Sequence, residues 1–251
     1  MLKPGRALVT GAGIRLGRAM AEALGADGWA VAVHYRSSDT GAQDCAEAIR
    51  AAGGRAELVQ ADLSNADDLD GLVKKASSVL DGPITLLVNS ASTFDDDSAR
   101  TFDRDSWDFH FDANLRAPVT LARNLANALP DDEKALVVNL IDQRVWKLNP
   151  QFFTYTLSKA ALLTATKTLA QALAPNVRVA GIGPGPTLAS IHQTAEDFAD
   201  EQRNTLTQSG SNPDEIVKAL RFLISSEAVT GQMIASDGGQ HLMWQTPDVP
   251  V

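Results

Sequence analysis

The sequence of 251 residues predicts one doubly wound α/β domain, in which helices cover both faces of a seven-stranded parallel sheet. Seven short apolar or β-branched runs alternate with longer stretches rich in Ala and Leu. These runs are mostly apolar, which is typical of parallel strands buried on both faces. An apolar content of 44% without linkers or repeats favours one core, so we expect a single domain over residues 1–251.

The expected elements follow from these runs and from the turn residues between them. The predicted strands are Arg6–Val9, Ala30–His34, Ala56–Gln60, Leu86–Asn89, Leu136–Ile141, Val177–Ile182 and Gln232–Ala235. The predicted helices include Leu16–Ala26, Gly41–Ala52, Ala66–Leu80, Arg116–Leu129 and Thr156–Leu173. In such a sheet, ligands bind at the carboxyl ends of the strands.

The stretch from Pro184 to Pro213 differs from the rest of the chain. It is polar, contains a predicted helix at Ala195–Asn204 and breaks at Ser209-Gly-Ser-Asn-Pro213. An excursion at the carboxyl edge of a sheet is where a substrate lid usually lies, so we expect a lid at about 184–213.

Charge and the amino terminus exclude several classes of partner. The net charge of -9 argues against nucleic acid, because no basic stripe is present to bind phosphates. No apolar run reaches the ~18 residues that a membrane span needs. Residues 1–10 pass directly into a strand, which leaves no room for a signal peptide, so we expect a cytoplasmic protein without membrane contact. The single cysteine, Cys45, is interpreted as a helix-face residue.

Metal binding is not expected. The four histidines show no spacing typical of metal ligands, and no cysteine cluster accompanies them; they are His34, His110, His192 and His241. We interpret the acidic run Asp95-Asp96-Asp97 as a solvated loop rather than a magnesium site.

A glycine-rich turn, Thr10-Gly-Ala-Gly-Ile-Arg-Leu-Gly17, follows the first strand and opens the first helix. This context predicts a Rossmann-type dinucleotide site, whereas a plain strand-to-helix turn is the alternative. Gly11 permits the tight turn, and Gly17 permits close packing. The backbone amide groups at the start of the helix, including that of Leu16, are expected to bind the pyrophosphate.

The end of the second strand indicates which nucleotide is bound. An NAD site places a carboxylate there, but this chain has His34-Tyr35-Arg36-Ser37. Arg36 and Ser37, with Arg15, suit the 2′-phosphate of NADPH. The alternative makes Arg36 an ordinary surface cation.

Asp62 and Leu63 follow the third strand and are predicted to contact the adenine. Alternatively, Asp62 caps the next helix, a role for which Ser64 and Asn65 compete.

Tyr155 and Lys159 are four residues apart, which places them on one face of a helix. A fixed ammonium group stabilises the phenolate, so the phenol becomes a better proton donor near neutral pH. We therefore predict a proton-delivering pair.

With these features in this order, the chain resembles the short-chain dehydrogenases/reductases over essentially its whole length. The shared landmarks are the turn at 10–17, Asp62, Asn89-Ser90-Ala91-Ser92, Asn114, Tyr155 with Lys159, Pro184-Gly185, and Asp237-Gly238-Gly239. The resemblance implies that Asn114 holds a helix kink and a proton-relaying water, and that Lys159 bonds the nicotinamide ribose. It also implies a homotetramer, with Asn89, Ser90, Ala91, Pro184 and Gly185 at the cofactor.

Two departures from the common pattern make the chain similar to pteridine reductases and dihydromonapterin reductases. Arg15 stands where most members have a glycine, and Asp142 stands where most have a catalytic serine, 13 residues before Tyr155. That subgroup implies an Asp142, Tyr155 and Lys159 triad, with Arg15 over cofactor and substrate. It also implies a pterin stacked between nicotinamide and Phe94, beside Ser92. Trp146 is assigned to the pocket wall.

Asp142 is chemically suited to this role, because reducing a C=N bond requires a proton on nitrogen. Burial beside an apolar ring raises the pKa of a carboxyl group, so it can act as an acid or as a relay to Tyr155. The alternative is that Asp142 merely pairs with Arg144 or Lys147.

The sequence thus predicts an NADPH-dependent reductase of a pterin-like small molecule. Within the same fold, a ketone or 3-oxoacyl reductase is the alternative, because this fold accepts many substrates. A catalytically silent NADPH-binding sensor is the alternative from another class, although the retention of Tyr155 and Lys159 argues against it.

Overall fold

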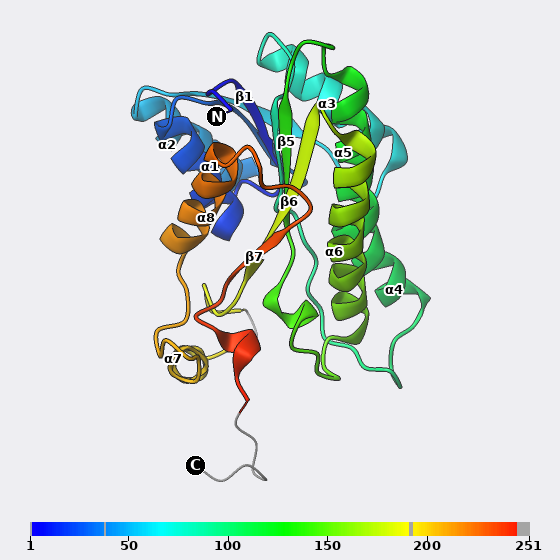
Figure 1. Cartoon of the computed structure of the whole chain (residues 1–251), viewed down its shortest axis with the longest axis vertical. Helices are drawn as coiled ribbons and strands as arrows, with labels where there is room; N and C mark the ends of the chain where they lie inside the picture. Colours follow the sequence, from blue (N-terminus) through cyan, green and yellow to red (C-terminus); the bar gives the residue numbers. More distant parts are fainter. Residues whose placement is uncertain (1, 38, 191–192, 245–251) are drawn as a thin grey trace.

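The structure, a computed structural model, describes residues 2–37, 39–190 and 193–244. Within them, seven parallel strands form one sheet in the order β3-β2-β1-β4-β5-β6-β7, which confirms the predicted fold class (Figure 1). Part of the predicted lid, 191–192, and with it His192, lies outside the described residues. Across the described residues, no helix is both long and apolar enough to cross a bilayer.

The strands begin and end within two residues of their predicted limits. They are β1 Arg6–Val9, β2 Ala30–Tyr35, β3 Arg55–Gln60, β4 Leu86–Asn89, β5 Ala135–Leu140, β6 Val177–Pro184 and β7 Met233–Ser236. The sixth strand is two residues longer than predicted, because Gly183 and Pro184 pair with β7. A proline is compatible with the last position of a strand, which the sequence pattern alone did not reveal.

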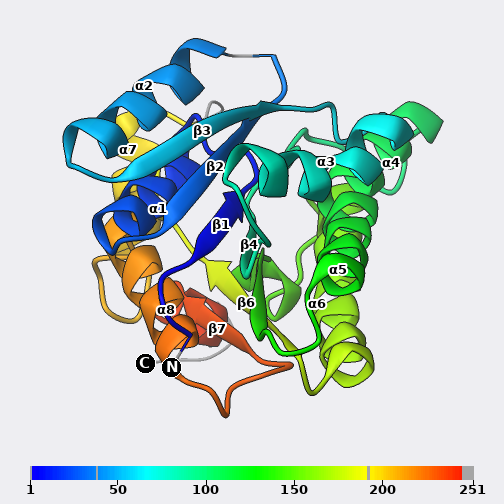
Figure 2. The same ribbon diagram turned by 90° about the horizontal axis from the view of Figure 1, so that it is seen from above.

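Three helices pack on each face of the sheet, as Figure 2 shows. One face carries α1 Arg15–Ala26, α2 Asp39–Ala51 and α8 Pro213–Ser225. The opposite face carries α3 Ala66–Val79, α5 Ala117–Ala128 and α6 Phe153–Leu173. Apolar side chains from alternate strand positions face each layer, so each face of the sheet has its own buried core.

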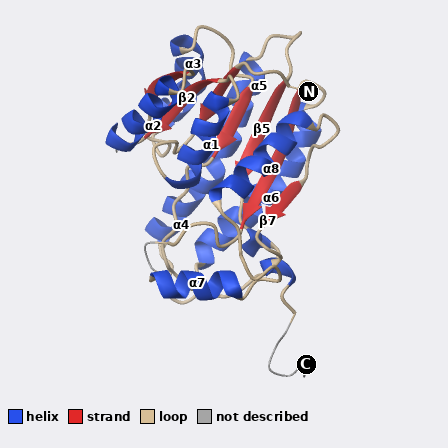
Figure 3. Ribbon diagram, turned by 90° about the vertical axis from the view of Figure 1, so that its left-hand side faces the viewer, coloured by secondary structure: helices blue, strands red, loops and turns tan. Residues whose placement is uncertain are grey.

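Two further helices lie beyond one end of the sheet (Figure 3). They are α4 Arg104–Phe111 and α7 Ala195–Arg203, and α7 agrees with the helix predicted in the lid. Both begin with a capping box, formed by Asp103 with Ser106 and by Thr194 with Asp197. Neither α4 nor α8 was among the named predicted helices. Asn212 caps α8 directly before Pro213, so the turn signal at this site is also a helix start.

The strand order reverses between β1 and β4, and one side chain joins the two strands there. The hydroxyl oxygen of Thr10 accepts hydrogen bonds of 3.0 Å from the backbone N–H groups of both Ser90 and Ala91. The exits of β1 and β4 are thereby held at a fixed separation. This switch point is where doubly wound sheets bind ligands.

Candidate active site

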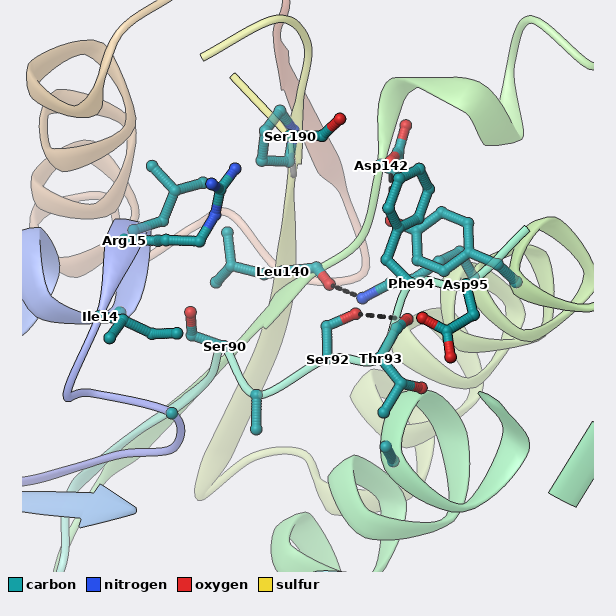
Figure 4. Close-up of a pocket in the computed structure, with 18 of the residues that line it drawn as sticks. Ile14, Arg15, Ser90, Ser92, Thr93, Phe94, Asp95, Leu140, Asp142 and Ser190 are labelled. Atoms are coloured by element: carbon teal, nitrogen blue, oxygen red, sulfur yellow. Dashed lines mark hydrogen bonds between the residues drawn. The ribbon is translucent and has the colours of Figure 1, made fainter. Parts of the chain in front are cut away.

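A cavity of about 1260 Å³ lies at the carboxyl ends of the strands (Figure 4). Its volume exceeds the roughly 300–1,000 Å³ of a typical small-molecule site, so it has room for a dinucleotide and a second ligand. Most of the predicted site residues line it: Gly11, Arg15, Leu16, Gly17, His34, Tyr35, Arg36, Ser37, Asp62, Leu63, Ser90, Ala91, Ser92, Phe94, Asp142, Tyr155, Lys159, Pro184 and Gly185.

The predicted site residues Asn89 and Asn114 lie behind the cavity wall and do not line it. Asn89 is the last residue of β4, and its side-chain amide donates to Asn139 Oδ1 over 2.8 Å. Asn139 in turn donates to the Thr166 hydroxyl over 2.9 Å. This buried network joins β4, β5 and α6. The side chain of Asn89 therefore supports the site from behind the cavity wall, and its contact with the cofactor stays a prediction.

The glycine-rich turn packs so closely that no residue with a side chain fits at two of its glycine positions. Gly11 has a φ of +63°, and a Cβ atom there would lie 2.9 Å from Ala91 Cα. At Gly17, a Cβ atom would lie 2.2 Å from the carbonyl oxygen of Gly11. Helix α1 begins here without an acidic residue in its first turn, and no described side chain caps its amide groups. These amides can bind an anion.

His34 supports this turn from below. Its ring is 2% exposed; Nδ1 accepts from the Gly11 amide over 3.1 Å, and Nε2 donates to the Ala61 carbonyl over 3.2 Å. Burial lowers the pKa of His34 to about 4, so the ring is neutral at physiological pH. A neutral ring supplies the one acceptor and one donor that these two contacts require.

The nucleotide end of the cavity has the charges expected from the sequence. Arg36 and Ser37 follow β2 and are exposed at the cavity edge. Asp62 accepts from the hydroxyl and the amide of Ser64, and these bonds lower its pKa. Asn65 caps α3, so Asp62 does not serve as the helix cap.

Asp142, Tyr155 and Lys159 converge where β5 ends and α6 begins. The Tyr155 hydroxyl donates to Asp142 Oδ2 over 2.8 Å, and Asp142 Oδ1 accepts from the Arg144 backbone amide over 2.7 Å. Lys159 Nζ donates to the Leu140 carbonyl over 2.8 Å. The Arg144 guanidinium donates instead to Asn149, so the carboxyl group of Asp142 faces Tyr155 rather than that cation.

Burial dominates the electrostatics of this triad. Burial raises the pKa of Asp142, and burial together with the neighbouring Asp142 raises the pKa of Tyr155 well above its ordinary value. Burial lowers the pKa of Lys159 to about 8, although Asp142 opposes this shift. A carboxyl group with a raised pKa retains its proton at higher pH, so it can act as an acid.

Asn114 lies in a π-helical turn, η1 Asp112–Arg116, between α4 and α5. Its side-chain oxygen accepts from the Ser92 hydroxyl and the Thr93 amide, and its nitrogen donates to Thr93 and to Ser158. The turn is the helix irregularity implied at this position. Asn114 thus ties the loop after β4 to α6 behind Tyr155.

Aromatic rings form the wall opposite Arg15 (Figure 4). Phe94 stacks on Phe152 with ring centroids 4.2 Å apart, and its ring meets Tyr155 edge-on at 4.7 Å. The Arg144 guanidinium lies 5.2 Å from the centroid of Phe152. Phe152 has a φ of +52°, a strained conformation for a bulky side chain.

Arg15 connects the glycine turn to the predicted lid. Its guanidinium donates to the carbonyl oxygens of Ala189 and Leu188 over 2.8 and 3.1 Å. Arg15 itself has a φ of +51°. Pro186, Leu188, Ser190, Gln193 and Glu201 line the cavity from the same segment, so it forms one wall of the site.

Two expectations around the site were wrong. Asp97 is buried rather than solvated, because its carboxylate accepts from the backbone and hydroxyl of Thr154 at the start of α6. Trp146 does not line the cavity; it is 46% exposed and packs against the His241 ring. Within the described residues, no group of acidic, histidine or cysteine side chains is arranged to hold a metal ion.

Several cavity residues were missed. Phe152 lies just outside α6 in a left-handed conformation, so helical spacing from Tyr155 could not have indicated it. Gln143, Gln193, Glu201 and Gln240 had no usable signal either, because only the folded chain brings these separate segments together.

Comparison with known proteins finds reductases and oxidoreductases that match nearly the whole chain. A family model described as enoyl-(acyl carrier protein) reductase matches residues 11–241. An uncharacterized oxidoreductase from Methylorubrum extorquens is 34% identical over 93% of this chain and 96% of its own length. A 3-oxoacyl-[acyl-carrier-protein] reductase from Synechocystis is 32% identical over 93% and 95%. The structure of FolM, alternative dihydrofolate reductase 1, from Brucella suis in complex with NADP has 49% identity, a TM-score of 0.95 and 100% coverage of both chains.

Proposed function

Because the chain belongs to the short-chain dehydrogenase/reductase family, we propose that it is an NADPH-dependent reductase of the C=N bond of a dihydropterin-like substrate. The contact of Asp142 with the Tyr155 hydroxyl carries this proposal, because it places a carboxyl group of raised pKa beside the proton donor. The similarity to FolM from Brucella suis, named as an alternative dihydrofolate reductase, supports it.

The residues at the nucleotide end fit NADPH. The start of α1 offers uncapped amides between Gly11 and Gly17, where the close packing leaves backbone rather than side chains facing the ligand. Arg36 and Ser37 would hold the 2′-phosphate, and Asp62 the adenine. Lys159, with its ammonium group at the Leu140 carbonyl, would bond the nicotinamide ribose. NADPH, when bound, supplies the hydride.

The proton is handled by the chain's own side chains. Tyr155 would donate its hydroxyl proton to the substrate nitrogen as the adjacent carbon accepts the hydride. The resulting phenolate is opposed by an ionised Asp142 but stabilised by a protonated one, which can return a proton to it. The raised pKa of Asp142 favours that protonated form, so the two groups would act as a relay.

We further propose that Phe94 stacks on the substrate ring beside Ser92, and that the segment at about 184–213 covers the site. Arg15 already fixes part of that segment to the glycine turn. From the family resemblance we also propose that the protein assembles as a homotetramer. We propose separately that it acts in the cytoplasm. Sedimentation equilibrium distinguishes a tetramer from smaller assemblies.

The decisive experiment is a substrate panel followed by NADPH absorbance. The wild-type protein is incubated with NADPH and dihydrobiopterin, dihydrofolate, a simple ketone or a 3-oxoacyl thioester. We expect oxidation of NADPH with the dihydropterins. Turnover of the ketone or the thioester without any dihydropterin would instead establish a carbonyl reductase, and binding of NADPH without turnover would favour a sensor.

A further inference from the structure

Three buried side chains, His110, Thr154 and Asp97, form a hydrogen-bond network behind the cavity wall, the Asp97 network. None of the three lines the cavity. His110 Nδ1 lies 2.7 Å from the hydroxyl oxygen of Thr154, and that hydroxyl donates to Asp97 Oδ2. His110 belongs to α4, Thr154 to the first turn of α6, and Asp97 to the loop after β4. The network therefore joins three segments that are far apart in the sequence.

Asp97 caps the amino terminus of α6 from outside the helix. Phe152, the residue before α6, makes no capping bond with its side chain. Instead, the carbonyl oxygen of Asp97 accepts from the Phe153 amide over 3.2 Å, and its Oδ1 accepts from the Thr154 amide over 3.0 Å. A carboxylate at the start of a helix satisfies amides that have no partner within the helix, and the helix dipole favours it there. The first turn of α6 is thus held by the loop after β4.

The contacts of His110 set the direction of the hydrogen bonds in the Asp97 network. Its Nε2 accepts from the backbone amide of Asp95 over 3.1 Å. Burial lowers the pKa of His110, so the ring is neutral near pH 7 and carries its single proton on Nδ1. Nδ1 therefore donates to the Thr154 hydroxyl, which directs its own hydrogen to Asp97. The network requires a hydroxyl at its centre and a carboxylate at its end.

Two side chains of the proposed site are next to members of this network. Phe94 precedes Asp95, whose amide is bonded to His110 (Figure 4). Tyr155 directly follows Thr154 in α6. The His110 ring also meets the Tyr155 ring edge-on, with centroids 6.0 Å apart. Because the network bonds the neighbours of both Phe94 and Tyr155, it fixes the aromatic wall relative to the phenol.

We propose that the Asp97 network positions Phe94 and Tyr155 at the separation that proton transfer to the substrate ring requires. The inference rests on the proposed function, in which Phe94 stacks on the substrate and Tyr155 donates the proton. The members of the network are positioning residues, because they act through these two side chains. Their effect on rate comes from geometry, since a misplacement of about 1 Å can lower a rate about 100-fold.

The test removes the central hydroxyl while keeping the shape of the side chain. Thr154→Val can neither donate to Asp97 nor accept from His110. Thr154→Ser keeps the hydroxyl and therefore both bonds. The matched control is Thr156→Val, two residues later in α6, because the buried hydroxyl of Thr156 has no hydrogen-bond partner among the described residues.

For each protein, kcat and KM are measured with NADPH and dihydrobiopterin, and NADPH affinity is measured by calorimetry. We expect Thr154→Val to lower kcat roughly 10–100-fold, because the phenol of Tyr155 is displaced from the substrate. NADPH affinity should be unchanged, since the bonds of the network join only α4, α6 and the loop after β4. Thr154→Ser and Thr156→Val should keep the wild-type kcat.

Asp97→Asn tests the direction of the bonds from the other end of the network. The amide group of the new side chain places a donor against either the amide or the hydroxyl of Thr154. In the second case the hydroxyl turns toward His110, whose proton then moves to Nε2 and faces the Asp95 amide. Either arrangement opposes two donors, so we expect a loss of kcat of the same order as in Thr154→Val.

Unfolding temperatures separate positioning from simple stabilisation. A lower unfolding temperature with wild-type kcat in Thr154→Val and Asp97→Asn would overturn the inference, because the network would then support the fold alone. An equal loss of kcat in Thr154→Ser or in Thr156→Val would also overturn it, since the bonded hydroxyl would not be the cause. Should Thr154→Val not fold, Asp97→Asn gives the same two outcomes.

Failure of the proposed function gives a different result from failure of the inference. In that case the wild-type protein itself reduces no dihydropterin, and the inference falls with the function. An active wild-type protein whose kcat is insensitive to both network variants refutes the inference alone.

Discussion

The hydroxyl of Tyr155 is bonded to the carboxyl group of Asp142 over 2.8 Å, at the junction of β5 and α6. In this arrangement the phenol and the carboxyl group share one proton path, and each affects the other's pKa. Neither group can be replaced without changing the proton affinity of its partner.

Replacing Asp142 by asparagine should separate hydrogen bonding from proton supply. The Asp142→Asn side chain can still bond Tyr155, but it has no acidic proton to return to the phenolate. We expect kcat for dihydropterin reduction to fall roughly 10²–10⁴-fold, the usual contribution of general acid catalysis. Stopped-flow absorbance of NADPH measures this rate. NADPH affinity should be unchanged, and wild-type kcat in the variant would contradict the relay.

The choice of nucleotide should depend on Arg36, which lies at the edge of the cavity after β2. Arg36→Ala removes a charge-assisted bond to the 2′-phosphate, so we expect the KM for NADPH to rise about 10–100-fold. The KM for NADH should change little, because NADH lacks that phosphate. Arg123→Ala, which breaks an exposed ion pair with Asp70, is the control. Equal effects on both nucleotides would show that Arg36 does not read the phosphate.

Two glycine substitutions should have opposite effects on stability. Gly17→Ala brings a Cβ atom against the Gly11 carbonyl, so we expect a lower unfolding temperature and weaker NADPH binding. Gly71→Ala, within α3, meets no atom of the described residues within 4 Å. It should stabilise the protein by about 0.5–1 kcal/mol through helix propensity. Calorimetry with and without NADPH measures both. An unaltered NADPH affinity in Gly17→Ala would contradict the close packing of the turn.

His34 should make stability depend on pH. Its pKa is about 4 in the folded protein and about 6.5 when unfolded, so the unfolded chain binds the extra proton between these values. Stability is therefore lost as pH falls from about 6.5 to about 4, by about 3 kcal/mol in total. Urea unfolding at a series of pH values measures the free energy.

The matched variant for this prediction is His34→Gln, which keeps polar groups but has no proton to gain in this range. Other groups contribute equally to both proteins, so the difference between the two curves isolates His34. We expect a shallower loss of stability on acidification in the variant. Parallel curves would show that the ring does not titrate as its burial implies.

The sequence was sufficient for the fold class because that class follows from repeated local signals. Buried strands, helix-length stretches and turn residues occur in an order that only a parallel, doubly wound sheet accommodates. The turn at Gly11 could be placed because it directly follows β1, and the pair Tyr155 and Lys159 because it lies in the first two turns of α6.

The rest of the site depends on contacts between distant segments. Asp97 was taken for a solvated residue because its neighbours are acidic, yet Thr154, 57 residues later, buries it. Asn89 matches the family motif, but as the last residue of β4 it directs its side chain toward Asn139. Gln143 and Gln240 both line the cavity although they are far apart in the sequence, and no local pattern encodes that.

Arg15 also constrains how this enzyme can be re-engineered. Its guanidinium donates hydrogen bonds to the carbonyl oxygens of Leu188 and Ala189. One side chain therefore connects the glycine turn to the segment that forms this wall of the cavity. If this wall is moved into a homologue that has glycine at this position, the two bonds from Arg15 are lost. A chimera that receives the wall without Arg15 should therefore hold this segment less rigidly. Moving the glycine turn and the wall together keeps the hydrogen bonds between them.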